Sequence, residues 1–143
     1  MLAYDYHKRR TPENYLEPVK AILKVWNNDW DMKKGFFYSE KHLRLTINTK
    51  TISKLRYEPT KSSNKSILRY LNINTLVLKD CEIPNLLHLS DSHIKRLNLK
   101  ESSIRSLSGL NNLKSLKELV VGKEQFSKKQ LNLVPEGVKV IFE

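Results

Sequence analysis

The sequence has little of several residue types that mark specialised classes of protein. It contains one cysteine and four glycines among 143 residues. A single cysteine excludes an intrachain disulfide framework and any zinc site built from several cysteines. No apolar run approaches the roughly 18–20 residues that a membrane-spanning helix needs. The polar and aromatic segment 1–11 does not have the pattern of a secretory signal. We therefore expect a protein of the cytoplasm, or a cytoplasmic segment of a larger protein, with no membrane insertion.

Sequence motifs for catalysis are also missing. The chain has no glycine-rich phosphate loop, no GxSxG and no HExxH. His88 and His93 flank Asp91, but we expect both histidines to be solvated in a connecting segment rather than bound to a metal. Cys81 has an acidic residue on each side, which raises the pKa of a thiol, so we expect a structural thiol and not a nucleophile. These features predict a protein that is not an enzyme and that has no cofactor and no metal site.

Apolar residues in the second half of the chain recur at a fixed period. From Ile73 they follow with gaps of 3, 2, 5, 3 and 3, and the same series begins again 21 residues later at Ile94. The next copy begins 22 residues after that, at Leu116. An earlier copy contains Leu45 and has about ten extra residues, which we place in an insertion near 56–70. A degenerate copy begins at Val138. Such self-similarity is typical of repeat architectures.

This spacing predicts one kind of repeating unit. Two apolar residues separated by one residue lie on the same face of a short strand. The later apolar residues, spaced at threes, suit a helical or 3₁₀ return path. Because one such unit cannot bury its apolar face alone, neighbouring units must stack. We therefore expect an α/β solenoid with a parallel strand ladder, its strands lying near 43–48, 74–79, 95–100, 117–122 and 138–142.

The segment Ile94–Ile104, IKRLNLKESSI, resembles the LxxLxLxxNxL segment of leucine-rich repeats. In that family the Asn position hydrogen-bonds the backbone of the turn. Cys81 and Ser102 are acceptable residues there, whereas Lys50 departs from the pattern. The short period is most similar to bacterial arrays, some of which are attached to serine/threonine kinases. The resemblance implies a module that binds a partner protein on its concave strand face, within a larger bacterial signalling protein.

Residues 1–42 lack the repeat, and we expect them to form a partly helical N-terminal flank or cap before the repeats of 43–143. Thr11-Pro12-Glu13 is a helix start, whereas Pro18 predicts either a helix that begins near Glu17 or a kink. Trp26, Trp30 and Phe37 are expected to cover the core of the first repeat. Two alternatives are a ligand site built on the two tryptophans and the tail of an upstream domain.

The last residues predict a C-terminal cap made of a short helix and an edge strand. Ser127 and Gln130 have the spacing of a capping box, in which each side chain bonds the backbone of the other residue. Val138–Phe142 alternates as an edge strand does, and we expect Phe142 to face inward.

Strand alternation also predicts which side chains form the binding face. These side chains make a modest basic stripe with a small apolar centre at Val77 and Val120, and an acidic protein surface is its natural complement. The predicted site residues are Arg44, Thr46, Asn48, Thr75, Val77, Lys79, Arg96, Asn98, Lys100, Glu118 and Val120.

The charge balance keeps a second function open. Twenty-six Lys and Arg against 15 Asp and Glu give a net charge of +11, which raises the possibility of a nucleic-acid-binding protein. Lys8-Arg9-Arg10, beside Tyr4 and Tyr6, suits that alternative. However, residues 1–72 hold 15 basic and 7 acidic residues, so +8 of the charge lies outside the clearest repeats. We therefore favour a protein partner over nucleic acid.

Overall fold

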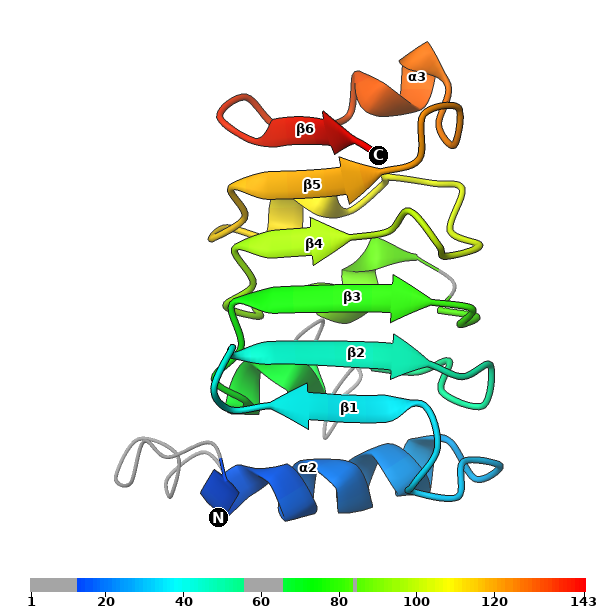
Figure 1. Ribbon diagram of the computed structural model, residues 1–143, viewed down its shortest axis with the longest axis vertical. Coiled ribbons are helices and arrows are strands. Elements are labelled where there is room, and N and C mark those ends of the chain that lie inside the picture. The colour runs from blue at the N-terminus through cyan, green and yellow to red at the C-terminus, as the bar shows by residue number, and fades with distance from the viewer. Residues whose placement is uncertain (1–12, 56–65, 84) are drawn as a thin grey trace.

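The computed structural model describes residues 13–55, 66–83 and 85–143, and shows an α/β protein built on one six-stranded, mostly parallel sheet (Figure 1). The strands lie side by side in chain order, so each new strand adds to the same edge of the sheet. They are β1 (Phe36–Ser39), β2 (Arg44–Asn48), β3 (Thr75–Lys79), β4 (Arg96–Asn98), β5 (Glu118–Val121) and β6 (Lys139–Phe142).

The strand register follows the spacing of the apolar residues. Leu45, Leu76, Leu97, Leu119 and Val140 lie side by side on successive strands. The four leucines of this row have no exposed surface. Three short 3₁₀ helices, η1 (Ile67–Tyr70), η2 (Leu86–Leu89) and η3 (Leu110–Asn112), lie in the return segments that connect the parallel strands. Their leucines and isoleucines, apart from the exposed Leu87, join the strand residues in one buried cluster.

Local polar contacts explain where the 3₁₀ helices begin. The Ser66 hydroxyl accepts a hydrogen bond from the Leu68 N–H, and the Asn85 amide oxygen accepts one from the Leu87 N–H. Gly109 precedes η3 with a φ of 90°, a conformation that L-residues with a side chain avoid. A Cβ atom at this position would also approach the Leu87 backbone nitrogen to 3.1 Å. A glycine is therefore required both by the turn and by the neighbouring return segment.

The turns after the strands use two different devices. Ser102 donates a hydrogen bond to the Leu99 carbonyl at 2.8 Å and accepts one from the Ile104 N–H at 3.4 Å. Cys81 is buried at the equivalent place. In the first copy, Lys50 is exposed, and the hydroxyls of Thr49 and Thr51 instead bond each other at 2.7 Å. A threonine pair thus closes the turn where the sequence departs from the repeat.

The N-terminal segment differs from its prediction in three respects. Helix α2 (Glu13–Trp26) runs through Pro18 without a break, so the alternative in which the helix begins near Glu17 is wrong. Strand β1 pairs antiparallel with β2, a pairing that the repeat pattern does not indicate. Trp26 is 36% exposed and Phe37 is 60% exposed, so neither covers the core as predicted.

Trp30 and Phe36 cover this end of the core instead. Trp30 has no exposed surface, and its ring centroid lies 5.4 Å from that of Phe36. The pairing of β1 with β2 gives the reason. Phe36 lies opposite the buried Ile47, whereas Phe37 lies opposite Thr46, on the other face of the sheet. Thr11 and Pro12 of the predicted helix start lie outside the described residues.

The C-terminal segment forms the other end of the sheet. Helix α3 (Lys128–Leu131) begins with the Ser127 hydroxyl accepting a hydrogen bond from the Gln130 N–H. The capping box is only half formed, because the Gln130 side chain accepts a hydrogen bond from the Leu107 N–H at 2.9 Å. Phe142 shares the inward side of the sheet with Val121 but is 49% exposed, since β6 is the last strand of the sheet. None of the helices in the described ranges is long and apolar enough to cross a membrane.

Candidate interaction face

The two faces of the sheet have different surroundings. One packs on the buried cluster, and the other, here called the outer face, carries the alternate side chains of β1 to β6. Ten of the eleven predicted site residues lie on the strands of this face, and Lys100 follows two residues after the end of β4. The register sets Arg44, Thr75, Arg96 and Glu118 in one row and Thr46, Val77, Asn98 and Val120 in the next.

A hollow of about 350 Å³ opens on the outer face over β2, β3 and β4. Six of the predicted residues line it, and Glu101, which the sequence analysis missed, completes the lining. Asn48, Thr75, Arg96, Glu118 and Val120 lie outside the hollow. The lining residues are Arg44, Thr46, Val77, Lys79, Asn98, Lys100 and Glu101.

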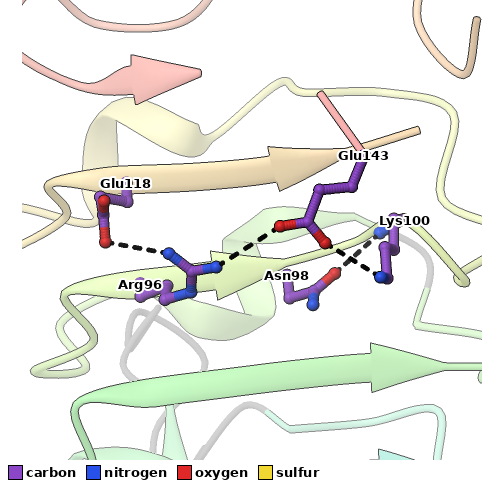
Figure 2. A network of polar contacts seen from close by, with 5 residues as sticks. All are labelled: Arg96, Asn98, Lys100, Glu118 and Glu143. Atoms are coloured by element: carbon purple, nitrogen blue, oxygen red, sulfur yellow. Dashed lines mark hydrogen bonds and ion pairs between the residues drawn. The ribbon is translucent and has the colours of Figure 1, made fainter. Parts of the chain in front are cut away.

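Val120 does not form the apolar centre that the sequence analysis gave it. It has no exposed surface, whereas Val77 is partly exposed. In its row Val120 lies between Asn98 of β4 and Ile141 of β6, and the Glu143 side chain reaches across this part of the sheet toward β4 (Figure 2). Val77 is therefore the apolar residue of the predicted set that a partner can contact.

A network of ion pairs occupies the β4–β6 end of the outer face (Figure 2). Arg96 Nη1 lies 3.1 Å from Glu118 Oε1, and Arg96 Nη2 lies 3.9 Å from Glu143 Oε2. The other oxygen of Glu143 lies 3.0 Å from Lys100 Nζ. Asn98 holds the turn beneath by accepting a hydrogen bond from the Lys100 backbone N–H at 3.1 Å. Two of the predicted cations are thus matched by carboxylates of the chain itself.

The two remaining cations of the predicted set, Lys79 and Arg44, differ in their surroundings. Lys79 Nζ lies 3.3 Å from Glu101 Oε2. Arg44 is exposed and has no carboxylate within 4.0 Å among the residues that the structure describes. Of the four predicted cations, only Arg44 therefore lacks an acidic partner in the described part of the chain. The face is less basic than its Lys and Arg alone suggest.

Phe37 is a residue of the outer face that the sequence analysis misplaced. Its side chain is 60% exposed, and it lies opposite Thr46 in the register, which puts it on the outer face next to the hollow. The alternation of side chains along Phe36-Phe37-Tyr38 could have indicated this position from the sequence. Once Phe36 packs inward with Trp30, the next side chain of a strand must point outward.

The two other groups considered for chemistry are structural. Cys81 is fully buried, and this burial raises the pKa of its thiol. His88 was predicted to be solvated, but only 8% of it is exposed, and its Nδ1 accepts a hydrogen bond from the Leu55 N–H at 3.2 Å. His93 is exposed. Within the described ranges, no three His, Cys, Asp or Glu side chains are grouped so that they could hold a metal ion.

The structure tests one of the two alternative binding sites considered in the first 42 residues, the ligand site built on Trp26 and Trp30. Trp30 is fully buried and cannot contact a ligand, so a site built on both tryptophans is wrong. The cluster Lys8-Arg9-Arg10 and its neighbouring tyrosines lie outside the described residues.

Comparison with protein-family models, with curated proteins and with solved structures finds no match to this chain.

Proposed function

We propose that this chain is a solenoid of the leucine-rich-repeat type and that it works as a non-catalytic module, binding a partner protein on its outer face. The observation that carries the proposal is the hollow over β2 to β4, which lies on the sheet face that the core does not use. The 21- and 22-residue spacing and the aligned leucines support the repeat assignment. A place in a larger bacterial signalling protein is proposed from the same resemblance, and a cytoplasmic location from the single free cysteine.

The chemistry of the hollow supports binding rather than catalysis. Its lining combines a hydroxyl, an amide, one apolar side chain and charged groups, which suits the mixed surface of a protein interface. It contains no cysteine, serine or histidine, and its one carboxylate, that of Glu101, is paired with Lys79.

The same residues give less support to nucleic acid. Phosphate binding depends on cations that can replace counterions. Lys79, Arg96 and Lys100 each already lie within 4.0 Å of a carboxylate. Single-stranded nucleic acids stack their bases on several exposed aromatic side chains. Near the hollow, Phe37 is the one exposed aromatic side chain in the described ranges.

The proposal is tested by blocking the hollow without disturbing the core. Val77→Arg places a long, charged side chain at a partly exposed position in the middle of the lining. The matched control is Val25→Arg, since Val25 is 71% exposed on α2 and does not line the hollow. Proteins captured from an extract of the cells that express the chain are compared for the two variants and the unchanged protein.

We expect the unchanged protein and Val25→Arg to capture the same partner, and Val77→Arg to lose it while its melting temperature stays within about 2 °C. Equal capture by all three proteins would show that the outer face is not the binding surface.

A further inference from the structure

A strip of two apolar side chains with a threonine between them crosses the outer face at its β1–β3 end. Phe37, Thr46 and Val77 lie side by side in one row, on three neighbouring strands. Side chains directly opposite in such a sheet have Cβ atoms about 4.5–5.5 Å apart, so the three form one continuous surface. Phe37 is the most exposed of them at 60%. An aromatic ring left in solvent beside a hollow is a typical anchor point for a partner side chain.

A single charge stands beside this strip. Arg44 precedes Thr46 by two residues on β2, which places its side chain on the same face and about 6.8 Å along the strand. Its neighbour across the sheet is Thr75, whose hydroxyl can also donate a hydrogen bond. Lys79, Arg96 and Lys100 each have a carboxylate of this chain beside them. Arg44 and Lys139 have none within 4.0 Å in the described ranges, and Lys139 lies on β6 at the opposite end of the sheet. The uncomplemented charge beside the strip therefore lies at Arg44.

We propose that this end of the outer face recognises an extended peptide segment that carries one carboxylate and one apolar or aromatic side chain two residues apart. The carboxylate pairs with Arg44 and Thr75, and the apolar side chain packs on Phe37 and Val77. This inference rests on the proposed function and names the chemistry of the partner.

The spacing of two residues follows from strand geometry. In an extended peptide, residues i and i+2 point to the same side and lie about 6.8 Å apart. Arg44 and the row of Thr46 have the same separation along β2. A peptide lying along the strands therefore brings one side chain to Arg44 and the next side chain on that side to Phe37 and Val77.

The acidic residues of the face limit how much negative charge the partner can carry. Glu101, Glu118 and Glu143 already pair with Lys79, Arg96 and Lys100, so these three cations are not free to bind a second or third carboxylate. A broadly acidic surface, as the sequence analysis expected, is therefore a poorer match than a segment with one acidic residue. Arginine also suits the site because its guanidinium binds a carboxylate through two parallel hydrogen bonds.

The test is a selection from a library of random twelve-residue peptides displayed on phage, with the full 143-residue chain as the target. We expect the enriched peptides to share Asp or Glu two positions from Phe, Tyr, Trp, Leu or Ile. One enriched peptide is then synthesised with a fluorescent label, and its affinity is measured by fluorescence anisotropy.

Four proteins decide the assignment. Arg44→Gln and Phe37→Ala should each weaken the peptide at least tenfold. Lys139→Gln is the matched control, because Lys139 is an exposed cation in the Arg44 row at the opposite end of the sheet, and it should change the affinity less than twofold. Replacing the acidic residue of the peptide by its amide should weaken binding to the unchanged protein tenfold and leave binding to Arg44→Gln unchanged.

Enriched peptides without an acidic residue, or an affinity that Arg44→Gln does not change, would overturn this inference and leave the protein-binding role standing. A selection that enriches no peptide would overturn it as well. The proposed function fails on a different result: Val77→Arg would still capture the cellular partner as well as the unchanged protein does.

Discussion

The hydrogen bonding and reactivity of single polar side chains in this protein depend on whether the repeat spacing buries them. Cys81 and Ser102 occupy equivalent places after two strands, and both are buried. Ser102 satisfies its hydroxyl with the Leu99 carbonyl. A thiol needs less hydrogen bonding, so Cys81 behaves there as a small apolar side chain. Its sulfur also meets the Ile83 backbone N–H, as the Ser102 hydroxyl meets that of Ile104. Burial has the larger effect on the thiol, so its reactivity should be low.

This burial predicts a slow reaction of the Cys81 thiol with iodoacetamide in the folded protein. Burial raises the pKa of the thiol, so little reactive thiolate is present near neutral pH. The raised pKa also means that the folded state holds the proton more tightly than the unfolded state does. Its contribution to stability should thus be complete below pH 9.0, the ordinary value, and be lost as the pH rises through the folded-state pKa.

Mass spectrometry of iodoacetamide-treated protein checks the first expectation, with the protein in urea as the fully reactive reference. Urea unfolding at a series of pH values checks the second. Cys81→Ala should remove the part of the decline above about pH 9 that belongs to the thiol. Equal labelling rates in buffer and in urea would mean that Cys81 is accessible in the folded protein.

His88 allows a second prediction at a single residue. Its Nδ1 accepts a hydrogen bond from the Leu55 N–H, and both residues are buried. His88→Leu leaves that backbone donor without this acceptor, which should lower the free energy of unfolding by about 1–3 kcal/mol. His88→Gln is the control, because its amide oxygen can still accept the bond and the loss should be smaller. Chemical denaturation of the three proteins measures both differences.

At the scale of elements, α2 shows where packing prevails over local preference. Pro18 removes one N–H from the helix interior, which argues against a continuous helix. The helix nevertheless runs from Glu13 to Trp26, with Tyr15, Val19 and Leu23 buried against the core. Pro18 itself is on the exposed side. The buried stripe therefore stabilises the helix enough to tolerate the proline.

Pro18→Ala should consequently stabilise the protein. The substitution restores a backbone hydrogen bond and removes the ring from an exposed helix position, and a proline in a helix interior costs up to about 3 kcal/mol relative to alanine. We expect the free energy of unfolding to rise by about 1–3 kcal/mol in urea denaturation. An unchanged or lower stability would indicate that the helix is already strained elsewhere or that the ring packs against its surroundings.

The sequence predicted the repeating elements well and the ends of the sheet poorly. The spacing around Leu76 and Leu97 places strands at 74–79 and 95–100, and they are observed at Thr75–Lys79 and Arg96–Asn98. Such strands are determined by a local apolar pattern that recurs. Strand β1 belongs to no repeat, and its antiparallel pairing depends on a partner that comes later in the chain. Periodicity alone cannot indicate such a contact.

The candidate site was predictable to the same extent. Alternation within the strands gave six of the residues that line the hollow. It could not show that Glu143, which is 43 residues beyond Lys100, would reach that lysine and Arg96. Nor could it show that Val120 would be fully covered. The distribution of charge on a face depends on long side chains that cross between strands, and their partners are fixed only in three dimensions.

Across the whole molecule, the core is one continuous cluster rather than a set of separate ones. It extends from Val19 of α2 through the leucines of the strands to Phe126, and Trp30 and Phe36 belong to it. The two ends differ, because α2 packs against η1 with the fully buried Val19 and Leu23, whereas β6 leaves its inward Val140 partly exposed. Stability should therefore be highest in the middle of the sheet and lower at the β6 end.

A pair of substitutions in one row of the sheet tests this gradient. Leu97 lies between Leu76 and Leu119 in the register, and none of the three has exposed surface. Leu97→Ala should lower the free energy of unfolding by about 2–5 kcal/mol, the usual cost of a cavity at a buried leucine. Val140→Ala, in the same row on the last strand, should cost about 1 kcal/mol or less because its side chain is already partly in water. Urea denaturation measures both. Similar losses at the two positions would mean that the end of the sheet is packed as tightly as its centre, and a small loss at Leu97 would contradict the register on which the fold and the outer face depend.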